Sequence, residues 1–364
     1  MKLDPPPKNI LIIRLSAIGD VIMASALIPA LQASYPDARI NWLVDEANGG
    51  LLTGNPRLHR VIVWPRRRWR EMLRQGHYLE WSRELKRLLI ALREERFDLV
   101  LDIQGLLKSG IWAFLSGGKT RIGLGSREGS QWLMHAVIDR KTEHWTVGSE
   151  YLKLVRSLGF EPAHFDMDIV VSEQIGKESA ALLKSAGVVK PFAVICPFTT
   201  RPQKHWFDDR WVELSARLAN ERGLQVVMLG GPADGQAAEA IASGTATTAN
   251  LVGRTGLEQC AAIIESAGLL IGVDTGLTHL GIAMRTPTLA LFGPTRPYLD
   301  IGTAKAKVLY NRIECSPCHR RPTCHGEFTC MKLHTVDKVL SATAELLSFS
   351  PVPTKETNRS QTRG

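Results

Sequence analysis

Residues 271–295, IGVDTGLTHLGIAMRTPTLALFGPT, place an acid, threonines, a glycine and a histidine directly after an apolar run. We expect a strand over 269–273, a turn at Asp274, and then a helix whose first turn carries His279. The backbone N–H groups at the start of a helix have no intrahelical partner, and the helix dipole adds partial positive charge there. Gly276 lets a bulky anion approach the backbone closely. The segment is a candidate phosphate-binding turn at the carboxyl edge of a parallel sheet, and a plain helix cap is the alternative.

A second polar cluster follows the apolar run FAVIC. The loop TTRPQKHW offers the hydroxyls of Thr199 and Thr200 and the ammonium group of Lys204. Hydroxyls donate hydrogen bonds to phosphate oxygens and a lysine supplies a point charge, so this loop is a candidate diphosphate site. An ordinary polar loop is the alternative. We expect Trp206 and Trp211 to pack into the core at the start of the next helix.

Two acids end the loops that follow other strands. Asp20 closes LSAIGD at a strand-to-helix junction, and Asp234 closes LGGPAD after a later strand. A carboxylate at such a junction either caps the helix or meets a ligand. For Asp20 the second interpretation is a general base that takes the proton of a substrate hydroxyl. For Asp234 it is a contact to ribose hydroxyls, as in nucleotide-binding folds.

Apolar strand-like runs alternate with amphipathic helices along the chain, which predicts an α/β protein with parallel sheets covered on both faces. The expected strands are 10–14, 40–44, 60–64, 99–103, 192–196, 225–229, 269–273 and 288–292, and the expected helices include 24–34, 82–95, 211–221 and 257–266.

The 364 residues suffice for two domains of ordinary size. We expect two doubly wound domains, 1–171 and 191–349, joined by a helical linker at 172–190. A space between two such domains suits a reaction of two substrates. The polar, proline-containing tail 350–364 is expected to be disordered.

The composition, 44% hydrophobic and 22% charged, is that of a globular protein. No apolar run approaches the roughly 20 residues that span a bilayer. The start MKLDPPPKN lacks the layout of a secretory signal, so we expect a cytoplasmic protein. An NAD-dependent dehydrogenase is disfavoured because no expected strand ends in GxGxxG.

The formal net charge of +9 points to an anionic partner. Basic residues gather after Trp64, where tryptophans are interleaved with them, and such a mixture suits a membrane interface or a phosphate-rich substrate. A solvated helix face is the alternative, and no motif supports nucleic-acid binding. The cluster contains Arg66, Arg67, Arg68, Arg70, Arg74, Arg83, Lys86 and Arg87, with Trp64, Trp69 and Trp81 among them.

Four of the six cysteines form the pattern Cys315-x2-Cys318-x5-Cys324-x5-Cys330, which is not a standard zinc-finger spacing. A CxxC pair in a cytoplasmic chain suggests metal or redox chemistry. A structural zinc or iron–sulfur site is one interpretation, and unligated thiols or disulfides are the other. The remaining cysteines, at 196 and 260, are expected to be core residues.

Four segments together resemble the bacterial lipopolysaccharide heptosyltransferases: RLSAIGDVIMASALIPAL, DIQGLLKSG, TTRPQKHW and DTGLTHLGIAMRTPTLALFGPT. The resemblance runs from about residue 8 to residue 347, and the last two segments are more similar to the heptosyltransferase I branch than to the second enzyme. It implies a GT-B fold of two Rossmann-like domains, the first for the acceptor and the second for ADP-heptose. It also implies inverting, metal-independent transfer of L-glycero-D-manno-heptose to the Kdo of the lipopolysaccharide inner core. The enzyme would then work as a peripheral protein on the cytoplasmic face of the inner membrane.

The resemblance also implies residue roles. Asp20 takes the position of the catalytic base, and Lys204 that of a diphosphate contact which stabilises the leaving group. The donor-binding positions are Thr199, Thr200, Lys204, Asp234, Thr255, Asp274, Thr275, Gly276 and His279. Asp234 stands where the first branch more usually has a glutamate. The positions for the anionic Kdo–lipid A acceptor are Arg66, Arg67, Arg70, Lys108 and Arg127.

Two other functions stay open at this point. The nearer is heptosyltransferase II, or a same-family transferase with another nucleotide sugar, because a similar cysteine-bearing tail occurs in members that resemble heptosyltransferase II. The other is a non-catalytic sensor that binds a nucleotide sugar through the same residues.

Overall fold

The computed structural model describes residues 3–142, 146–319 and 321–348. Strands β1 (Asn9–Ile13), β2 (Arg39–Asp45), β3 (Leu58–Trp64), β4 (Leu99–Asp102), β5 (Thr120–Leu124) and β6 (Ala136–Ile138) form one sheet. Strands β7 (Phe192–Cys196), β8 (Gln225–Met228), β9 (Thr248–Asn250), β10 (Leu269–Val273), β11 (Thr288–Phe292) and β12 (Ala306–Tyr310) form the other.

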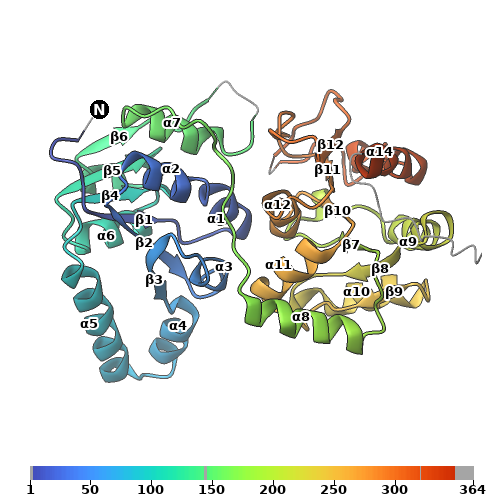
Figure 1. The fold of residues 1–364 in the computed structure, drawn as a ribbon, viewed down its shortest axis with the longest axis horizontal. Coiled ribbons are helices and arrows are strands. Elements are labelled where there is room, and N and C mark those ends of the chain that lie inside the picture. The colour runs from blue at the N-terminus through green and yellow to red at the C-terminus, as the bar shows by residue number, and fades with distance from the viewer. Residues whose placement is uncertain (1–2, 143–145, 320, 349–364) are drawn as a thin grey trace, which may run out of the picture.

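The two sheets share one topology. Their strand orders are β3-β2-β1-β4-β5-β6 and β12-β11-β10-β7-β8-β9, and the strands pair in parallel throughout. Numbered along its own stretch of chain, each sheet has the doubly wound order 3-2-1-4-5-6. The predicted α/β fold of two Rossmann-like sheets is confirmed, and Figure 1 shows the two halves side by side.

Helices cover both faces of each sheet. In the N-terminal half they are α1 (Ile18–Ala24), α2 (Leu27–Ser34), α3 (Gly50–Thr53), α4 (Arg66–Arg74), α5 (Tyr78–Glu94), α6 (Leu107–Leu115), the 3-10 turn η1 (Ser130–Leu133) and α7 (Ser149–Ser157). In the C-terminal half they are α8 (Glu173–Ser185), η2 (Pro202–Lys204), α9 (Asp208–Arg222), η3 (Pro232–Asp234), α10 (Gly235–Ser243), α11 (Leu257–Ser266), α12 (Gly276–Ala283), α13 (Thr329–Lys332) and α14 (Val336–Ser348).

The central strands are apolar on both faces because each face meets a different hydrophobic cluster. In β1, Ile10 and Ile12 pack into one cluster, whereas Leu11 and Ile13 pack into another. Strands buried on both faces therefore appear in the sequence as continuous apolar runs. For this reason β7, β10 and β11 have the bounds that the sequence predicts.

Helix predictions were less accurate near the site. The sequence predicted one helix over 24–34, but the structure has α1 and α2 with a break at Ser25 and Ala26. The Ser25 hydroxyl donates to the carbonyl of Ile22 at 2.6 Å and its oxygen accepts the N–H of Asp168 at 2.8 Å. These side-chain bonds favour a turn here over a continuous helix.

The segment expected to link the halves contains α8. Ser172 caps this helix by accepting the N–H of Ile175 at 3.4 Å, and α8 packs against α11 of the C-terminal half. The C-terminal helix α14 packs on α9 and β11. The predicted tail 350–364 lies outside the described residues.

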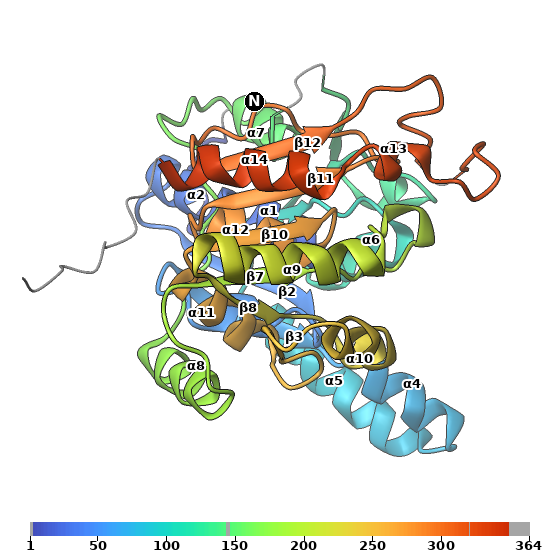
Figure 2. The same ribbon diagram turned by 90° about the vertical axis from the view of Figure 1, so that its right-hand side faces the viewer.

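Helices α4 and α5 form a hairpin that projects from the N-terminal half, as the lower right of Figure 2 shows. Among the described residues, no helix is both long enough and apolar enough to cross a membrane.

Candidate active site

The two halves touch where α1 meets α12, directly after β1 and β10. A Cβ added to Gly19 would lie 2.5 Å from Cδ2 of His279, and one added to Gly276 would lie 2.6 Å from Cγ2 of Ile18. Neither glycine can carry a side chain without moving the other half of the chain. Gly276, predicted to admit an anion, thus has a second and independent reason to be glycine.

Asp20 lies in the first turn of α1, with its side chain 38% exposed. Its Oδ2 accepts the N–H of Ala17 at 3.3 Å and forms an ion pair with Arg14. The capping role is therefore present, because one oxygen of the carboxylate accepts a backbone N–H at the start of α1. The structure assigns no bond to the other oxygen, Oδ1, among the described residues.

Arg14, at the end of β1, is the buried partner of Asp20. Its Nη1 donates to the carbonyl of Ile103 at 3.0 Å, and the side chain is only 6% exposed. Burial lowers the pKa of Arg14, but nearby Tyr151, Asp20 and Glu150 outweigh it, so the pKa is raised and the guanidinium stays charged.

Gln104, which follows β4, holds the loop between Arg14 and Asp20. Its Oε1 accepts the N–H groups of Leu15 at 2.8 Å and Ser16 at 3.3 Å. Sequence reasoning assigned no role to either Arg14 or Gln104. The sequence does contain a signal for Arg14. It is an arginine at the end of an apolar strand, and a charged group buried there needs a partner.

On the other side of the contact, Lys204 and Asp274 form a buried pair. Lys204 Nζ lies 2.5 Å from Asp274 Oδ2, and the two side chains are 14% and 13% exposed. The same Oδ2 accepts the Thr295 hydroxyl at 2.6 Å. Burial raises the pKa of Asp274, but His279 and Lys204 outweigh it and hold that pKa well below its usual value.

His279 extends this network to the loop after β11. Its Nε2 lies 3.5 Å from Asp274 Oδ1, and its Nδ1 lies 2.8 Å from the Tyr298 hydroxyl. Tyr298 is half-buried, and the loss of solvent around its hydroxyl raises its pKa well above its usual value, so it keeps its proton. Thr295 and Tyr298, like Arg14, were not predicted, because residues far apart in sequence make these bonds.

The threonines of the two predicted phosphate sites are placed differently. Thr275 is the N-cap residue of α12, where the first N–H groups have no intrahelical partner. Thr199 and Thr200 lie in the loop before η2, and neither hydroxyl bonds to a described residue. His205 holds this loop through a 2.8 Å contact of Nε2 with the carbonyl of Thr199. The predicted packing of Trp206 is confirmed, since it is 2% exposed.

Asp234 and Thr255 lie in loops of the same half. Asp234 Oδ2 accepts the N–H of Gly231 at 2.8 Å, which closes the GGPAD turn, but its side chain makes no capping bond to α10. The Thr255 hydroxyl lies 3.2 Å from Cys260 Sγ. Both Cys260 and Cys196 are buried, as expected.

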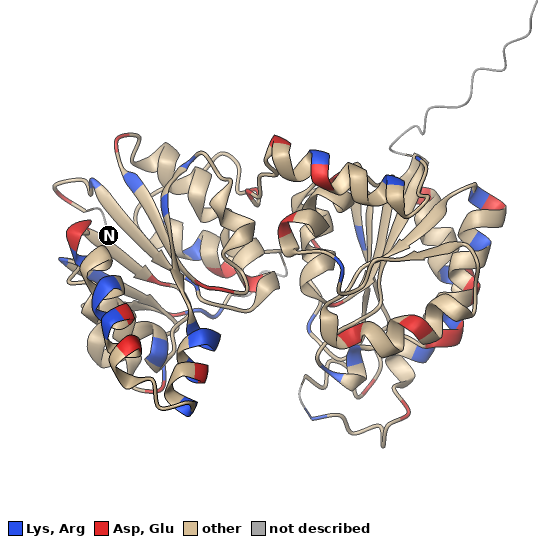
Figure 3. Ribbon diagram, turned by 90° about the horizontal axis from the view of Figure 1, so that it is seen from below, with Lys and Arg blue, Asp and Glu red and all other residues tan. Residues whose placement is uncertain are grey.

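The basic residues predicted for an acceptor divide into two groups. Arg66, Arg70 and Lys108 line one groove between α4, α5 and α6, here called the α4–α6 groove, with a volume of about 640 Å³. Arg67 and Arg127 are exposed nearby but do not line it. Figure 3 shows basic residues spaced along the helical hairpin.

The four cysteines lie close enough together for their charges to interact, and a zinc or iron–sulfur site there stays a prediction. Cys315, Cys318, Cys324 and Cys330 are all free thiols, and no three His, Cys, Asp or Glu side chains among the described residues are arranged to hold a metal ion. The segment packs by other contacts. The His319 N–H donates to the carbonyl of Pro294 at 2.6 Å, and the His319 carbonyl accepts from Gln203 Nε2 at 3.1 Å.

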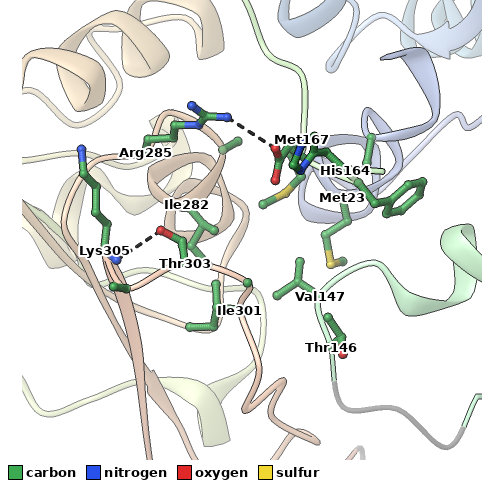
Figure 4. A pocket seen from close by; sticks show the side chains of 16 residues that line it. Met23, Thr146, Val147, His164, Met167, Ile282, Arg285, Ile301, Thr303 and Lys305 are labelled. Atoms are coloured by element: carbon green, nitrogen blue, oxygen red, sulfur yellow. Dashed lines mark hydrogen bonds and ion pairs between the residues drawn. The ribbon is translucent and has the colours of Figure 1, made fainter. Parts of the chain in front are cut away.

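A separate pocket of about 470 Å³ lies between the halves at the far ends of α1 and α12 (Figure 4). The ion pair of Arg285 with Asp166, at 3.4 Å, lies at its edge. None of the predicted site residues lines this pocket, so it is distinct from the site around Asp20.

Comparisons with known proteins bear on the family and the fold of this chain. Residues 85–328 match the model of glycosyltransferase family 9 (heptosyltransferase). The chain is 32% identical to lipopolysaccharide heptosyltransferase 1 of Pseudomonas aeruginosa, over 87% of each chain, and 28% identical to that of Escherichia coli, over 83% of this chain and 92% of the relative. The structure of E. coli heptosyltransferase WaaC with ADP-2-deoxy-2-fluoro heptose matches with a TM-score of 0.70 and 25% identity, covering 93% of this chain and 99% of that one.

Proposed function

The chain belongs to glycosyltransferase family 9, and on that premise we propose that it is a heptosyltransferase I. It transfers L-glycero-D-manno-heptose from ADP-heptose to the Kdo of the lipopolysaccharide inner core, with inversion at the anomeric carbon. The observation that carries the proposal is the position of Asp20 at the contact between the halves: its neighbour Gly19 packs against His279, which interacts with the Asp274 of the Lys204–Asp274 pair. The relatives named heptosyltransferase 1 support the choice of donor and acceptor.

Asp20 is the general base. Its Oδ2 is occupied by Arg14 and Ala17, which leaves Oδ1 to accept the proton of the acceptor hydroxyl. The hydroxyl oxygen then attacks the anomeric carbon on the face opposite the diphosphate, so the carbon–oxygen bond to ADP breaks as the new bond forms. Arg14 and Gln104 are positioning residues, because they fix the loop that carries Asp20.

Lys204 and the start of α12 stabilise the charge that develops on the leaving ADP. Preorganised positive groups at such a point lower the barrier, and here the protein itself supplies them. Asp274 holds the Lys204 ammonium in place, while the N–H groups of Thr275 and Gly276 at the start of α12 have no intrahelical acceptor and no partner among the described residues. Asp274 also contacts the sugar of the donor through one of its two carboxylate oxygens.

Other parts of the C-terminal half bind the rest of the donor. The hydroxyls of Thr199 and Thr200 contact phosphate oxygens, Asp234 contacts the ribose, and Thr255 lies at the adenine edge. We assign residues 191–349 to the donor and residues 1–171 to the acceptor, with 172–190 as the connection.

Arg66, Arg67, Arg70, Lys108 and Arg127 bind the anionic Kdo–lipid A acceptor. Because this acceptor lies in a leaflet, the enzyme binds peripherally to the cytoplasmic face of the inner membrane, with the basic, tryptophan-containing hairpin toward the lipid.

The test is ADP release from ADP-heptose by the purified protein, with Kdo–lipid A, with heptosylated Kdo–lipid A, or with neither. Release that requires Kdo–lipid A supports the proposal. Release only with the heptosylated acceptor would assign the chain to heptosyltransferase II. Tight ADP-heptose binding without release in either case would favour a sensor and contradict the proposal.

A further inference from the structure

The α4–α6 groove has an apolar floor that the proposed chemistry does not use. It runs along α6 from Lys108 to Leu115, about 10 Å at 1.5 Å per residue. Ile111 on α6 and Leu73 on α4 are 43% and 39% exposed within it. The remaining apolar lining consists of Trp64, Trp69, Trp81, Leu85, Trp112 and Leu115. Exposed apolar surface of this kind marks a site of interaction.

The same groove has a cationic rim. Arg66, Arg70 and Arg74 from α4 and Lys108 from α6 line it, and no carboxylate of the described residues does. Burial lowers the pKa of Lys108, and the charge of Arg66 lowers it further. A bound anion would relieve both effects. The carboxylates of Asp45 and Glu128 offset part of the charge near Lys108, but the four basic side chains leave the rim positive on balance. An apolar floor with a positive rim is complementary to an anionic lipid.

The inner end of the groove is next to the reaction site. Lys108 is close enough to Arg14 for the two charges to interact, and Arg14 is paired with Asp20. A ligand whose anionic group meets Lys108 can therefore direct its sugar toward Asp20 and its hydrocarbon away from it, along α6.

We propose that the α4–α6 groove binds a fatty acyl chain of the acceptor lipid while its anionic groups meet Arg66 and Lys108. This inference rests on the proposed function, since it gives a place to one part of that acceptor. It makes the acyl chain a specificity determinant, so that the enzyme distinguishes a lipid acceptor from its soluble sugar portion.

The first test compares the KM of Kdo–lipid A with that of its fully deacylated derivative. Because each buried methylene strengthens binding several-fold, we expect the KM of the deacylated acceptor to be at least about tenfold higher, with kcat unchanged. Ile111→Asn should raise the KM for the acylated acceptor by about tenfold and leave that for the deacylated one unchanged. Equal KM values for both acceptors in the wild-type enzyme would overturn the inference.

Phe114→Asn is the matched control. Phe114 lies on the same helix and is 53% exposed, but it does not line the groove. It should leave both KM values unchanged. If Phe114→Asn and Ile111→Asn have the same effect, α6 contacts a lipid aggregate broadly and the groove is not the binding site.

A binding measurement separates failure of the groove from failure of the transferase. Dodecyl phosphate with bromine on its chain, used below its micelle concentration, quenches tryptophan only where the chain touches the ring. We expect quenching beyond that by unbrominated dodecyl phosphate in the wild type and in Phe114→Asn, and a loss of it in Ile111→Asn. Quenching without any ADP release would refute the proposed function alone. No extra quenching in the wild type would refute acyl-chain binding in the α4–α6 groove but not the proposed transferase function.

Discussion

The two halves of the molecule place reactive side chains at the same point of the same topology, but they hold them differently. Between β7 and β10, Lys204 and Asp274 are already paired and only 14% and 13% exposed. Between β1 and β4, Asp20 is 38% exposed and has one oxygen free of described partners. The C-terminal half is thus a preformed, largely dehydrated site, whereas the N-terminal half presents an accessible carboxylate.

This difference corresponds to the two proposed substrates. A nucleotide sugar is small and carries its charge on the diphosphate, so a rigid, preorganised site suits it. A lipid acceptor is large and enters from a membrane surface. The N-terminal half, which is assigned to this acceptor, has an exposed carboxylate and a basic α4–α5 hairpin. Shared topology sets where a site forms, and the residues after each strand set which ligand it suits.

Asp20→Asn should distinguish the roles of the two halves most clearly. We expect kcat to fall by about a thousandfold, because the general base is lost, while the affinity for ADP stays unchanged. Steady-state ADP release and calorimetric titration with ADP measure the two quantities. Asp37→Asn, which changes an exposed carboxylate of the same half, is the control. A fall in ADP affinity as large as that in kcat would show that the halves do not act separately.

Lys204→Met should affect both catalysis and folding of the C-terminal half. Loss of one such charge-stabilising group costs about 3 kcal/mol in the barrier, so we expect kcat to fall about a hundredfold. The variant also leaves Asp274 buried without its cation, which should lower the melting temperature. Lys184→Met, at an exposed position on α8, should do neither. An unchanged melting temperature would contradict the preformed pair.

Gly19→Ala tests the contact itself. The new Cβ would lie 2.5 Å from His279, so the halves must separate slightly. Reaction geometry is sensitive to such displacement, and we expect kcat to fall about tenfold or more with ADP affinity retained. Gly235→Ala, where an added Cβ meets nothing within 4 Å, is the control. Wild-type turnover by Gly19→Ala would mean that the reaction does not require this contact.

The smallest expected effect is a pH dependence confined to the C-terminal half. Burial lowers the pKa of His334, helped by the charges of Lys338 and Arg210, and its ring nitrogens contact Phe292 and Asn311. The neutral form is favoured by folding, so its stabilisation is complete above the unfolded pKa of about 6.5 and is lost as the pH falls through the folded pKa.

We therefore expect the unfolding free energy of this half to fall by about 1 kcal/mol at most between pH 7 and pH 5.5. Urea titrations read by hydrogen exchange of β11 measure it. His334→Gln, which cannot titrate, should show a weaker dependence. An equal pH dependence in the two proteins would assign the effect to other groups.

Strands that are buried on both faces were predicted from the sequence more accurately than strands that are partly exposed. β7, β10 and β11 were predicted to the residue because both of their faces are covered. β5, β6, β9 and β12 were missed: β6, β9 and β12 are short or lie at the edges of their sheets with partly exposed side chains, and so lack a continuous apolar run.

The site was predictable where a motif carries its own strand, turn and helix. Asp20, Lys204 and Asp274 were identified in this way, and the structure brings each to a switch point of its sheet. Residues that support them, such as Gln104 and Thr295, come from loops after other strands, so only the folded chain reveals these contacts. The metal interpretation of the cysteines stays a prediction: the fold brings the four thiols near one another, but no three potential ligands among the described residues are arranged as a metal site.

The contact at Gly19 and Gly276 limits how closely the two halves of the molecule can approach each other. Backbone meets side chain there with no space for another atom, so the halves are free to move apart but not to approach further. The closest approach of the two halves is therefore set by glycine hydrogen atoms, and a side chain at either position would hold the halves farther apart.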